Sequence, residues 1–303
     1  MTDVSDKTRG LDGLEGKADE PQSKPASGVE WVWLVPAFVV LAASLWLQTQ
    51  PPQRELFLAI NRWSGQFPVA LWSFVTLLGE ADVLFCVLSP LLLWRPQMML
   101  AILAAVPLGG LLSVALKAIF QAPRPATVID PAQFNVIGIA LGNASFPSGH
   151  TITAFAAALA VVLVQSISSK RAAPQSALFN TITFATLALL AAALIGLSRV
   201  AVGAHWPVDV LAGAACGWLA GCSGAWISHR FPAIWRASLS QFVLGQLLLL
   251  TGLWLLFKTP AYPAGVLAVW LAVVCVLATV AGLFIKVRNQ LRRSTGSRAR
   301  PVK

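Results

Sequence analysis

Charged side chains are scarce in this chain of 303 residues. They make up 11% of the sequence, whereas soluble domains carry about a quarter. This scarcity excludes an ordinary soluble domain. Hydrophobic residues make up 57% of the chain, and several apolar runs reach the roughly 20 residues that cross a bilayer. We therefore expect an all-α, polytopic transmembrane helix bundle, folded as one compact unit rather than as two soluble domains.

Cysteines are also few, and the N-terminal segment does not have the composition expected of a cleavable leader. Cys86, Cys216, Cys222 and Cys275 lie within apolar runs and lack the spacing of metal ligands, so we interpret them as small core residues. Residues 1–29 are polar and acidic and lack the short positive segment of a secretory signal. We therefore expect the first apolar run to be an uncleaved membrane anchor. No internal repeat is present.

The apolar runs predict about eight membrane spans. A six-helix core lies within residues 30–230, and two additional spans lie within residues 231–287. Glu80 and Asp82 interrupt the second run, which makes it the least regular of the set. The expected spans are about 31–49, 73–94, 98–119, 150–167, 178–198, 206–227, 238–257 and 264–285.

The segments outside the spans are polar or amphipathic. Residues 52–70 mix charged and apolar side chains, and we expect an amphipathic helix there that lies in the membrane interface. Residues 1–29 and 290–303 have the composition of disordered tails. From Lys286 onward there are seven basic residues and no acidic one. Beside a membrane helix, this basic tail (288–303) indicates contact with anionic lipid rather than with nucleic acid.

The distribution of basic residues predicts which way the bundle faces. Eight spans place both termini on one side, and the basic C-terminus indicates that this side is the cytoplasm. The loops expected on that side carry basic residues without an acidic one, namely Arg95, Lys170, Arg171, Arg230 and Arg236. The sequence therefore predicts a multi-pass protein of a bacterial inner membrane, with both tails cytoplasmic and the opposite helix ends at the periplasm.

Three polar motifs stand out against the apolar background, and each lies at the end of an expected span. All three fall at the periplasmic ends when the spans are oriented as above. They supply three permanent cations, two of the three histidines and one carboxylate, which suffice to hold a phosphate group and cleave a bond to it. The motifs read Lys117-x6-Arg124-Pro125, Pro147-Ser148-Gly149-His150 and Ser198-Arg199-x5-His205-x3-Asp209.

Each of the three cations has a possible structural role. Lys117 could mark a span end, and Arg199 could interact with a helix C-terminus. Arg124 lies between Pro123 and Pro125, which stiffen its loop, and a guanidinium on a stiff turn is suited to bidentate contact with phosphate. None of the three cations has an acidic residue nearby in the sequence. An external anion therefore explains them together.

The second motif predicts a phosphate-binding helix start. Ser148 is a suitable N-cap for a helix beginning near His150, and Gly149 allows the backbone to approach a ligand closely. Free N–H groups at such a helix start can bind phosphate oxygens.

The third motif predicts an activated histidine. His205 and Asp209 are four residues apart and share one helix face, so the carboxylate can fix the imidazole tautomer and leave the other nitrogen as a nucleophile. A metal site built from His150, His205 and Asp209 is the alternative interpretation. The three neighbouring cations disfavour it.

Two further segments bear on packing and on the membrane. Gly213, Gly217 and Gly221 recur at four-residue steps, which predicts a small-residue face for close helix packing. The loop 126–146 carries enough apolar side chains to rest on the lipid surface, namely Val128, Ile129, Phe134, Val136 and Ile137.

The three motifs together resemble those of the type 2 phosphatidic acid phosphatase family, which shares its site with vanadium haloperoxidases. All three match without a departure, and the resemblance covers roughly residues 55–227. It implies that His205, oriented by Asp209, forms a phosphohistidine, and that His150 protonates the leaving oxygen and then activates water. It implies no metal and no other cofactor. The residues that it implies for phosphate binding are Lys117, Arg124, Ser148, Gly149 and Arg199.

The sequence therefore predicts an integral-membrane phosphatase that acts on a lipid phosphate or diphosphate. Undecaprenyl diphosphate is favoured only because it is a common substrate, and phosphatidate, phosphatidylglycerol phosphate and lipid A phosphates fit as well. A lipid phosphotransferase with the same residues is the nearest alternative, and a transporter or a non-catalytic scaffold is a remote one. The sequence leaves the oligomeric state open.

Overall fold

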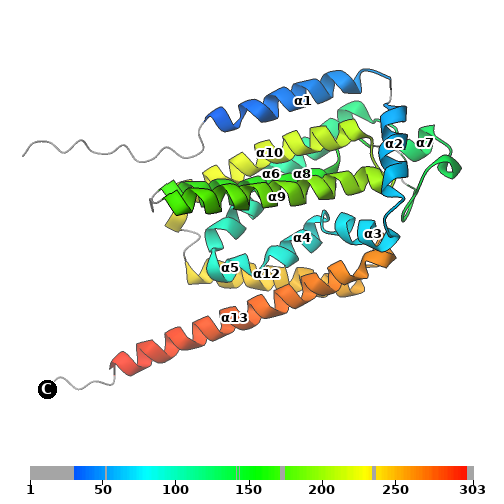
Figure 1. The fold of residues 1–303 in the computed structure, drawn as a ribbon. Coiled ribbons are helices and arrows are strands. Elements are labelled where there is room, and N and C mark those ends of the chain that lie inside the picture. Colours follow the sequence, from blue (N-terminus) through cyan, green and yellow to red (C-terminus); the bar gives the residue numbers. More distant parts are fainter. Residues whose placement is uncertain are drawn as a thin grey trace, which may run out of the picture.

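The computed structural model describes residues 31–51, 53–140, 142, 144–170, 175–233 and 237–298. Every regular element in these ranges is a helix, which confirms the predicted all-α class. In chain order (Figure 1) the elements are η1 (Trp31–Trp33), α1 (Val35–Gln48), α2 (Arg54–Ser64), α3 (Val69–Leu77), α4 (Ala81–Leu88), α5 (Leu91–Trp94), α6 (Pro96–Phe120), α7 (Pro125–Val128), η2 (Pro131–Gln133), α8 (Gly149–Lys170), α9 (Gln175–Ala201), α10 (Pro207–Arg230), α12 (Ser238–Phe257), η3 (Pro263–Gly265) and α13 (Val266–Arg298).

The number of full-length spans is smaller than predicted. Among the described residues, six helices are long and apolar enough to cross a membrane: α6, α8, α9, α10, α12 and α13. The first expected span is the 14-residue helix α1, whose length of about 21 Å is less than the roughly 30 Å of a bilayer core. The second expected span consists of α3 and α4, which meet at 79°. Counted as one broken span, this pair gives a seventh.

An ion-paired cluster accounts for the polar residues at this break. Glu80 and Asp82 lie where α3 gives way to α4, and the Lys258 ammonium contacts their carboxylates at 2.6 and 2.7 Å. Ionised side chains at membrane depth are costly unless they are paired. Since Lys258 immediately follows α12, the cluster also ties the broken span to the last two helices.

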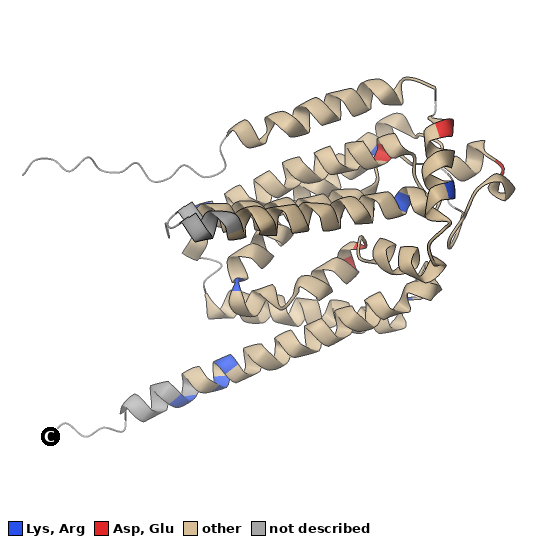
Figure 2. Ribbon diagram, viewed as in Figure 1, with Lys and Arg blue, Asp and Glu red and all other residues tan. Residues whose placement is uncertain are grey.

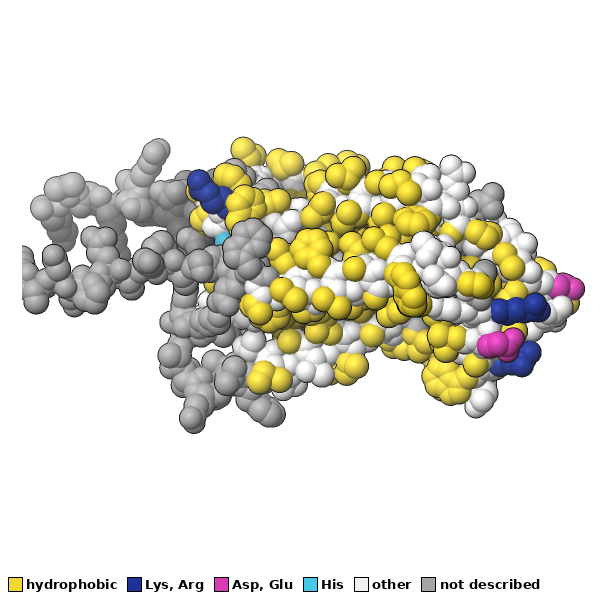
Figure 3. Space-filling model, turned by 90° about the horizontal axis from the view of Figure 1, so that it is seen from above, with side chains coloured by type: hydrophobic (Ala, Val, Ile, Leu, Met, Phe, Trp, Pro, Cys, Tyr) yellow, Lys and Arg dark blue, Asp and Glu magenta, His cyan; other side chains and the backbone are white. Residues whose placement is uncertain are grey.

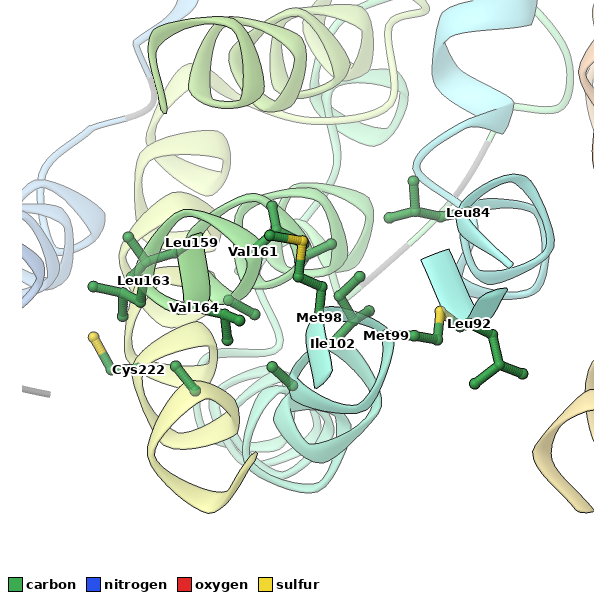
Figure 4. Close-up of a cluster of buried hydrophobic side chains, with 14 of the residues drawn as sticks. Leu84, Leu92, Met98, Met99, Ile102, Leu159, Val161, Leu163, Val164 and Cys222 are labelled. Carbon is green, nitrogen blue, oxygen red and sulfur yellow. The ribbon is translucent and has the colours of Figure 1, made fainter. Parts of the chain in front are cut away.

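Helix α8 lies at the centre of the bundle and packs against α6, α9 and α10. Figure 4 shows one of the hydrophobic clusters that join these helices, which includes Met98 and Ile102 of α6, Leu159 and Leu163 of α8, and Cys222 of α10. The cysteines behave largely as expected of small core residues, because all four are free and three are buried, whereas Cys275 is half-buried.

The glycine face of α10 allows this helix to approach α8 closely. A Cβ atom on Gly217 would lie 2.5 Å from the Ile152 carbonyl oxygen, and one on Gly221 would lie 2.8 Å from the Ala156 carbonyl oxygen. A Cβ atom on Gly213 would lie 2.7 Å from the Ser148 carbonyl oxygen. These contacts confirm the predicted packing role and fix the start of α10 against the start of α8.

The amphipathic segment forms α2, which lies across one end of the bundle (Figure 1). Its buried face includes Phe57 and Asn61, while Trp63 is exposed. The Asn61 amide donates to the carbonyl oxygens of Val200 and Ala201 at the end of α9, at 3.1 Å each. Helix α2 therefore covers the end of α9 instead of forming a span.

The two ends of the bundle differ in charge. Helix α1 begins and α13 ends at the same end, opposite to α2 (Figure 1). Basic side chains of α13 lie toward that end (Figure 2), and apolar side chains are numerous between the ends on the face that Figure 3 shows.

Helix α13 continues to Arg298. The disorder predicted from residue 290 is therefore wrong for residues 290–298, because Gln, Leu and Arg are good helix formers. The tail 1–29, Arg171 and Arg236 lie outside the described residues.

We expect the same substitution at two glycines to have opposite effects. Gly217→Ala should destabilise the protein by about 1–3 kcal/mol, because the added methyl group overlaps the backbone of α8. Gly110→Ala should be neutral or stabilise by up to about 1 kcal/mol, because nothing lies within 4 Å of its Cβ position. Thermal unfolding in detergent measures both. Equal midpoints for the two variants would contradict the close packing of α8 and α10.

We also expect Lys258→Met to lower the thermal midpoint, because it leaves two carboxylates without their cation, at a cost of about 1.5–3 kcal/mol. Lys286→Met is the matched control, since Lys286 donates to the neutral Gln241 amide oxygen. Burial lowers the pKa of Lys258, but its hydrogen bonds to Asp82 and Glu80 outweigh burial and raise it above 10.5. The deficit of Lys258→Met should therefore be constant from pH 6 to pH 9, and a deficit that disappears in this range would exclude the ion pair as its cause.

Candidate active site

Four helix ends bring the three motifs together at the end of the bundle that α2 covers. Lys117 lies in the last turn of α6, and Arg199 lies in the last turn of α9. Gly149 begins α8, and Asp209 lies in the first turn of α10. Because neighbouring antiparallel helices alternate in direction, these starts and ends meet at one level, as the sequence predicted.

His205 and Asp209 form the predicted pair. The Nδ1 atom of His205 lies 3.2 Å from Asp209 Oδ2, and both side chains are buried. The Nε2 atom lies 3.2 Å from Arg124 Nη1. A guanidinium only donates hydrogen bonds, so Nε2 must be the acceptor and the ring proton must be on Nδ1. The carboxylate therefore holds the tautomer that keeps the lone pair on Nε2, where it accepts from Arg124 in this arrangement.

A tight turn after α9 positions His205. Gly203 has a φ of +76°, and a Cβ atom there would lie 2.7 Å from the Asn135 carbonyl oxygen. The turn folds back so that the N–H groups of Ala204 and His205 donate to the Arg199 carbonyl oxygen, at 3.0 and 3.2 Å. The Ser-Arg-x5-His spacing therefore places the imidazole directly beside the end of α9.

Asp209 has two further donors on the same oxygen. The Trp206 N–H donates to Oδ2 at 2.9 Å, which caps the start of α10, and the Ser145 hydroxyl also donates to it. Ser145 also lies 3.4 Å from His205 Nδ1. The sequence interpretation missed Ser145, because no spacing rule links it to a residue 64 positions away.

Arg124 reaches the site from the loop after α6. Gln121 adopts a left-handed conformation with φ of +40°, and α6 ends at the preceding residue. Arg124 then donates to the carbonyl oxygens of Ala204 at 3.0 Å and Ala144 at 3.4 Å. The guanidinium is therefore directed toward the nucleophile by the turn that the flanking prolines predicted.

The start of α8 lies between Lys117 and α10. The ideal Cβ position on Gly149 is 3.9 Å from the Lys117 ammonium, so a side chain there would fill the space beside it. The Ser148 N–H donates to the Asp209 carbonyl oxygen at 3.0 Å, and Ser148 Oγ accepts from the Thr151 hydroxyl at 2.9 Å. Ser148 immediately precedes the helix, as expected of an N-cap.

Arg199 is buried and is held by two residues that the sequence interpretation missed. Its Nη1 atom donates to the hydroxyls of Thr76 and Tyr262, and the latter bond is 3.0 Å long. Its Nε atom has no hydrogen-bond partner among the described residues. Thr76 and Tyr262 lie in α3 and in the α12–α13 connection, far from any motif, so nothing in the sequence pattern pointed to them.

A cavity of about 580 Å³ opens beside His150, between α4, α6 and α8. His150 lies at its polar end, and its Nε2 atom has no hydrogen-bond partner among the described residues. Ala157, deeper in the cavity, lies eight residues beyond Gly149, which is about 12 Å further along α8. The polar lining residues, together with Gly149, are Glu80, Asp82, Ser113, Gly149, His150 and Lys258. The apolar lining residues include Phe85, Ile102, Ala105, Val106, Ile152, Ala156 and Ala157.

The charges around His205 keep its imidazole neutral. Burial, followed by the positive charges of Arg199, Arg124 and Lys117, lowers the pKa of His205 well below 6.5. The site therefore concentrates positive charge around a neutral imidazole. No group of three His, Cys, Asp or Glu side chains in the described ranges is arranged to hold a metal ion, so the alternative metal site of His150, His205 and Asp209 is not formed.

The loop between α7 and α8 differs in part from its prediction. Val128 is exposed, as expected of a side chain at a lipid surface. Ile129 and Phe134 are buried instead, and Phe134 packs edge-on against Phe57 with ring centroids 5.1 Å apart. These two side chains pack inside the protein and not against lipid, because α2 offers this loop an apolar partner.

The family of this site follows from its matched residues. Residues 98–233, which contain all three motifs, match the model of the PAP2 superfamily. The match covers 136 of the 303 residues, which is somewhat less than half of the chain. The match to this PAP2 core begins at residue 98 rather than near residue 55, and it leaves out α1–α5, α12 and α13.

The chain is similar to one relative and to two solved structures, and two of these three proteins are named phosphatases. A lipid A 1-phosphatase of Porphyromonas gingivalis is 38% identical over 84 residues, which are 28% of this chain and only 16% of that relative's length. The crystal structure of Aquifex aeolicus LpxE is 29% identical and covers 58% of this chain and 93% of its own, with a TM-score of 0.45. A PAP2-type phosphatidylglycerolphosphate phosphatase of Bacillus subtilis is 20% identical and covers 66% and 95%, with a TM-score of 0.49.

The lowered pKa of His205 predicts the acid side of the pH profile. A nucleophile with a pKa of 6.5 would lose half its activity at that pH, whereas His205 should stay neutral well below it. We expect kcat/KM for phosphate release, corrected for the ionisation of the substrate's own phosphate group, not to fall as the pH is lowered from 8 to 6.5. A loss of activity on protonation of an enzyme group within this range would contradict a neutral His205.

Proposed function

We propose that the protein is a lipid phosphate phosphatase that works through a phosphohistidine on His205. The observation that carries this proposal is the imidazole itself, whose Nδ1 faces Asp209 and whose Nε2 faces Arg124 within a group of cations. Attack on a phosphoryl group requires an oriented lone pair on a neutral ring, with positive charge around the phosphoryl oxygens. The residues proposed to hold the phosphoryl oxygens are Lys117, Arg124, Ser148, Gly149 (through its backbone) and Arg199.

The proposed reaction has two steps. His205 Nε2 attacks phosphorus, the bond to the lipid oxygen breaks, and His150 gives that oxygen a proton. His150 then takes a proton from water, which attacks phosphorus and breaks the bond to Nε2, releasing inorganic phosphate. Asp209 stabilises the imidazolium character that His205 develops in both steps. No step requires a metal ion.

The lipid nature of the substrate is supported by the cavity beside His150. A leaving group protonated by His150 must lie next to that residue, at the polar end of a cavity that continues between apolar side chains. An acyl or isoprenoid chain has the chemistry to fill such a space. The name of the Porphyromonas gingivalis relative, a lipid A 1-phosphatase, points to the same class of substrate.

The charges at the mouth of the cavity favour a phosphate monoester. Glu80 and Asp82 outnumber Lys258 by one negative charge, and they line the region that the leaving group would occupy. An uncharged lipid alcohol is favoured there over an anionic leaving group. Of the candidate substrates, phosphatidate releases an uncharged alcohol, whereas undecaprenyl diphosphate releases an anionic monophosphate and phosphatidylglycerol phosphate releases an anionic phosphodiester. The charges at this end of the cavity therefore favour phosphatidate.

The proposed location is a bacterial inner membrane, with the site at the periplasmic face. At the opposite end of the bundle, Arg95 immediately precedes α6 and Arg230 ends α10, and basic residues of α13 lie toward the same end (Figure 2). Cytoplasmic loops are enriched in such residues. The same enrichment supports cytoplasmic termini and contact between the C-terminal tail and anionic lipid.

Turnover of lipid phosphates by the detergent-purified protein tests this proposal. His205→Ala should lower phosphate release at least about a thousandfold, because it removes the nucleophile. His229→Ala is the matched control and should leave activity unchanged, since His229 bonds to Gln97 at the other end of the bundle. Full activity in His205→Ala would refute the mechanism, and phosphate recovered on an acceptor lipid instead of in water would identify a phosphotransferase.

A second variant separates the two steps. With a lipid phosphate whose leaving group departs without a proton, His150→Ala should still form the phosphoenzyme but should hydrolyse it slowly. Labelled phosphate should then accumulate on the protein in a linkage that is stable in alkali and labile in acid, as expected of phosphohistidine. His150→Ala protein that turns over at the wild-type rate would exclude His150 as the general base.

A further inference from the structure

The connection between α12 and α13 reaches the phosphate site, although it lies outside the PAP2 core. Tyr262 in this connection is 4% exposed, and its hydroxyl accepts a hydrogen bond from Arg199 at 3.0 Å. We propose that Tyr262 is a positioning residue that, together with Thr76, orients the Arg199 guanidinium toward the phosphoryl group. This inference rests on the proposed role of Arg199 in holding phosphate.

Arg199 is a buried cation without an anionic partner. Its side chain is 2% exposed, and no carboxylate within the described residues forms an ion pair with it. A buried charge is costly unless another group compensates for it. The two hydroxyls compensate only in part, and an oxyanion entering the site would complete the set.

The hydroxyls of Thr76 and Tyr262 accept both hydrogens of one nitrogen of the Arg199 guanidinium. Nη1 carries two hydrogens, and Thr76 Oγ1 and Tyr262 Oη each accept one of them. Nε has no partner among the described residues. A guanidinium binds an oxyanion in a bidentate manner along one edge, and the edge that remains is the one containing Nε. Thr76 and Tyr262 therefore determine which edge is offered to phosphate.

Tyr262 is itself firmly held. A Cβ atom on Gly138 would lie 2.7 Å from the Ala261 carbonyl oxygen and 2.8 Å from the Tyr262 ring, and Gly138 has a φ of +82°. On the other side, a Cβ atom on Gly265 would lie 2.4 Å from the backbone of Ser73 in α3. The ring also lies 5.6 Å from the Arg199 guanidinium carbon. Such close backbone contacts leave the hydroxyl little freedom to move away from Arg199.

Both residues that orient Arg199 therefore come from outside residues 98–233. Thr76 belongs to the broken span, and Tyr262 belongs to the last helix pair. The two additional C-terminal spans are thereby part of the phosphate site and not a separate appendage. These two spans contribute to the site by orienting the Arg199 guanidinium through Tyr262.

Orthovanadate binding to the full-length protein in detergent tests this role, because the probe is a phosphate-like oxyanion that needs no lipid. Tyr262→Phe removes the hydroxyl and keeps the ring, and it should weaken binding and lower kcat/KM by about tenfold. Val269→Ala is the matched control, since Val269 is buried in the same cluster as Tyr262. It should lower the thermal midpoint and leave orthovanadate affinity unchanged. Equal losses of affinity in both variants, or none in Tyr262→Phe, would overturn the proposal.

Thr76 provides a second, independent pair of variants. Thr76→Val keeps the shape and removes the hydroxyl, so it should weaken orthovanadate binding as Tyr262→Phe does. Thr76→Ser keeps the hydroxyl and should bind nearly as tightly as the wild type. If Tyr262→Phe does not fold, this pair decides the matter, and equal affinities of Thr76→Val and Thr76→Ser would overturn the proposal.

The Arg199→Lys background separates this inference from the proposed function. A lysine has no Nε edge to orient, so adding Tyr262→Phe to Arg199→Lys should change affinity less than twofold. A tenfold further loss would show that Tyr262 acts independently of Arg199, which contradicts a positioning role. If Arg199→Lys alone binds orthovanadate and hydrolyses lipid phosphate normally, the proposed role of Arg199 in phosphate binding fails instead.

Discussion

The carboxylate of Asp209 is the point on which the geometry of the site depends. A single oxygen accepts hydrogen bonds from the Ser145 hydroxyl and the Trp206 N–H and contacts the His205 ring. The main chain of the same residue accepts from the Ser148 N–H. One residue thus links the start of α10, the start of α8 and the nucleophile. Loss of this carboxylate would remove both the cap at the start of α10 and the group that fixes the His205 tautomer.

The apolar bundle makes that arrangement precise. Three glycines on α10 bring its backbone against α8, so the two helix starts that bear His150 and Asp209 are held at a fixed separation. Rigid helices then carry the polar residues, and the short turns between them carry Arg124 and His205. Preorganised charge of this kind is effective because no rearrangement is needed when the substrate's charge develops. Packing far from phosphate therefore contributes to the chemistry.

Much of the site could be predicted from the sequence, because its residues lie at helix ends whose direction alternates along the chain. The His205–Asp209 pair and the start of α8 are local, so spacing alone sufficed. Ser145, Thr76 and Tyr262 were out of reach, since each meets its partner through tertiary packing across 60 or more positions. The broken span was visible as Glu80 and Asp82, but its partner Lys258 lies 176 positions or more away. The roles of the site residues as catalytic groups stay predictions.

The position of Tyr262 and Lys258 near the end of the chain has a consequence for biosynthesis. Helices of a polytopic protein are made and inserted in order from the N-terminus, so all three motifs enter the membrane before the α12–α13 pair exists. Until that pair docks, Arg199 lacks one of the hydroxyls that orient it and Glu80 lacks its cation. Maturation of the site is therefore coupled to completion of the polypeptide, and a nascent or truncated chain holds the motifs without their final arrangement.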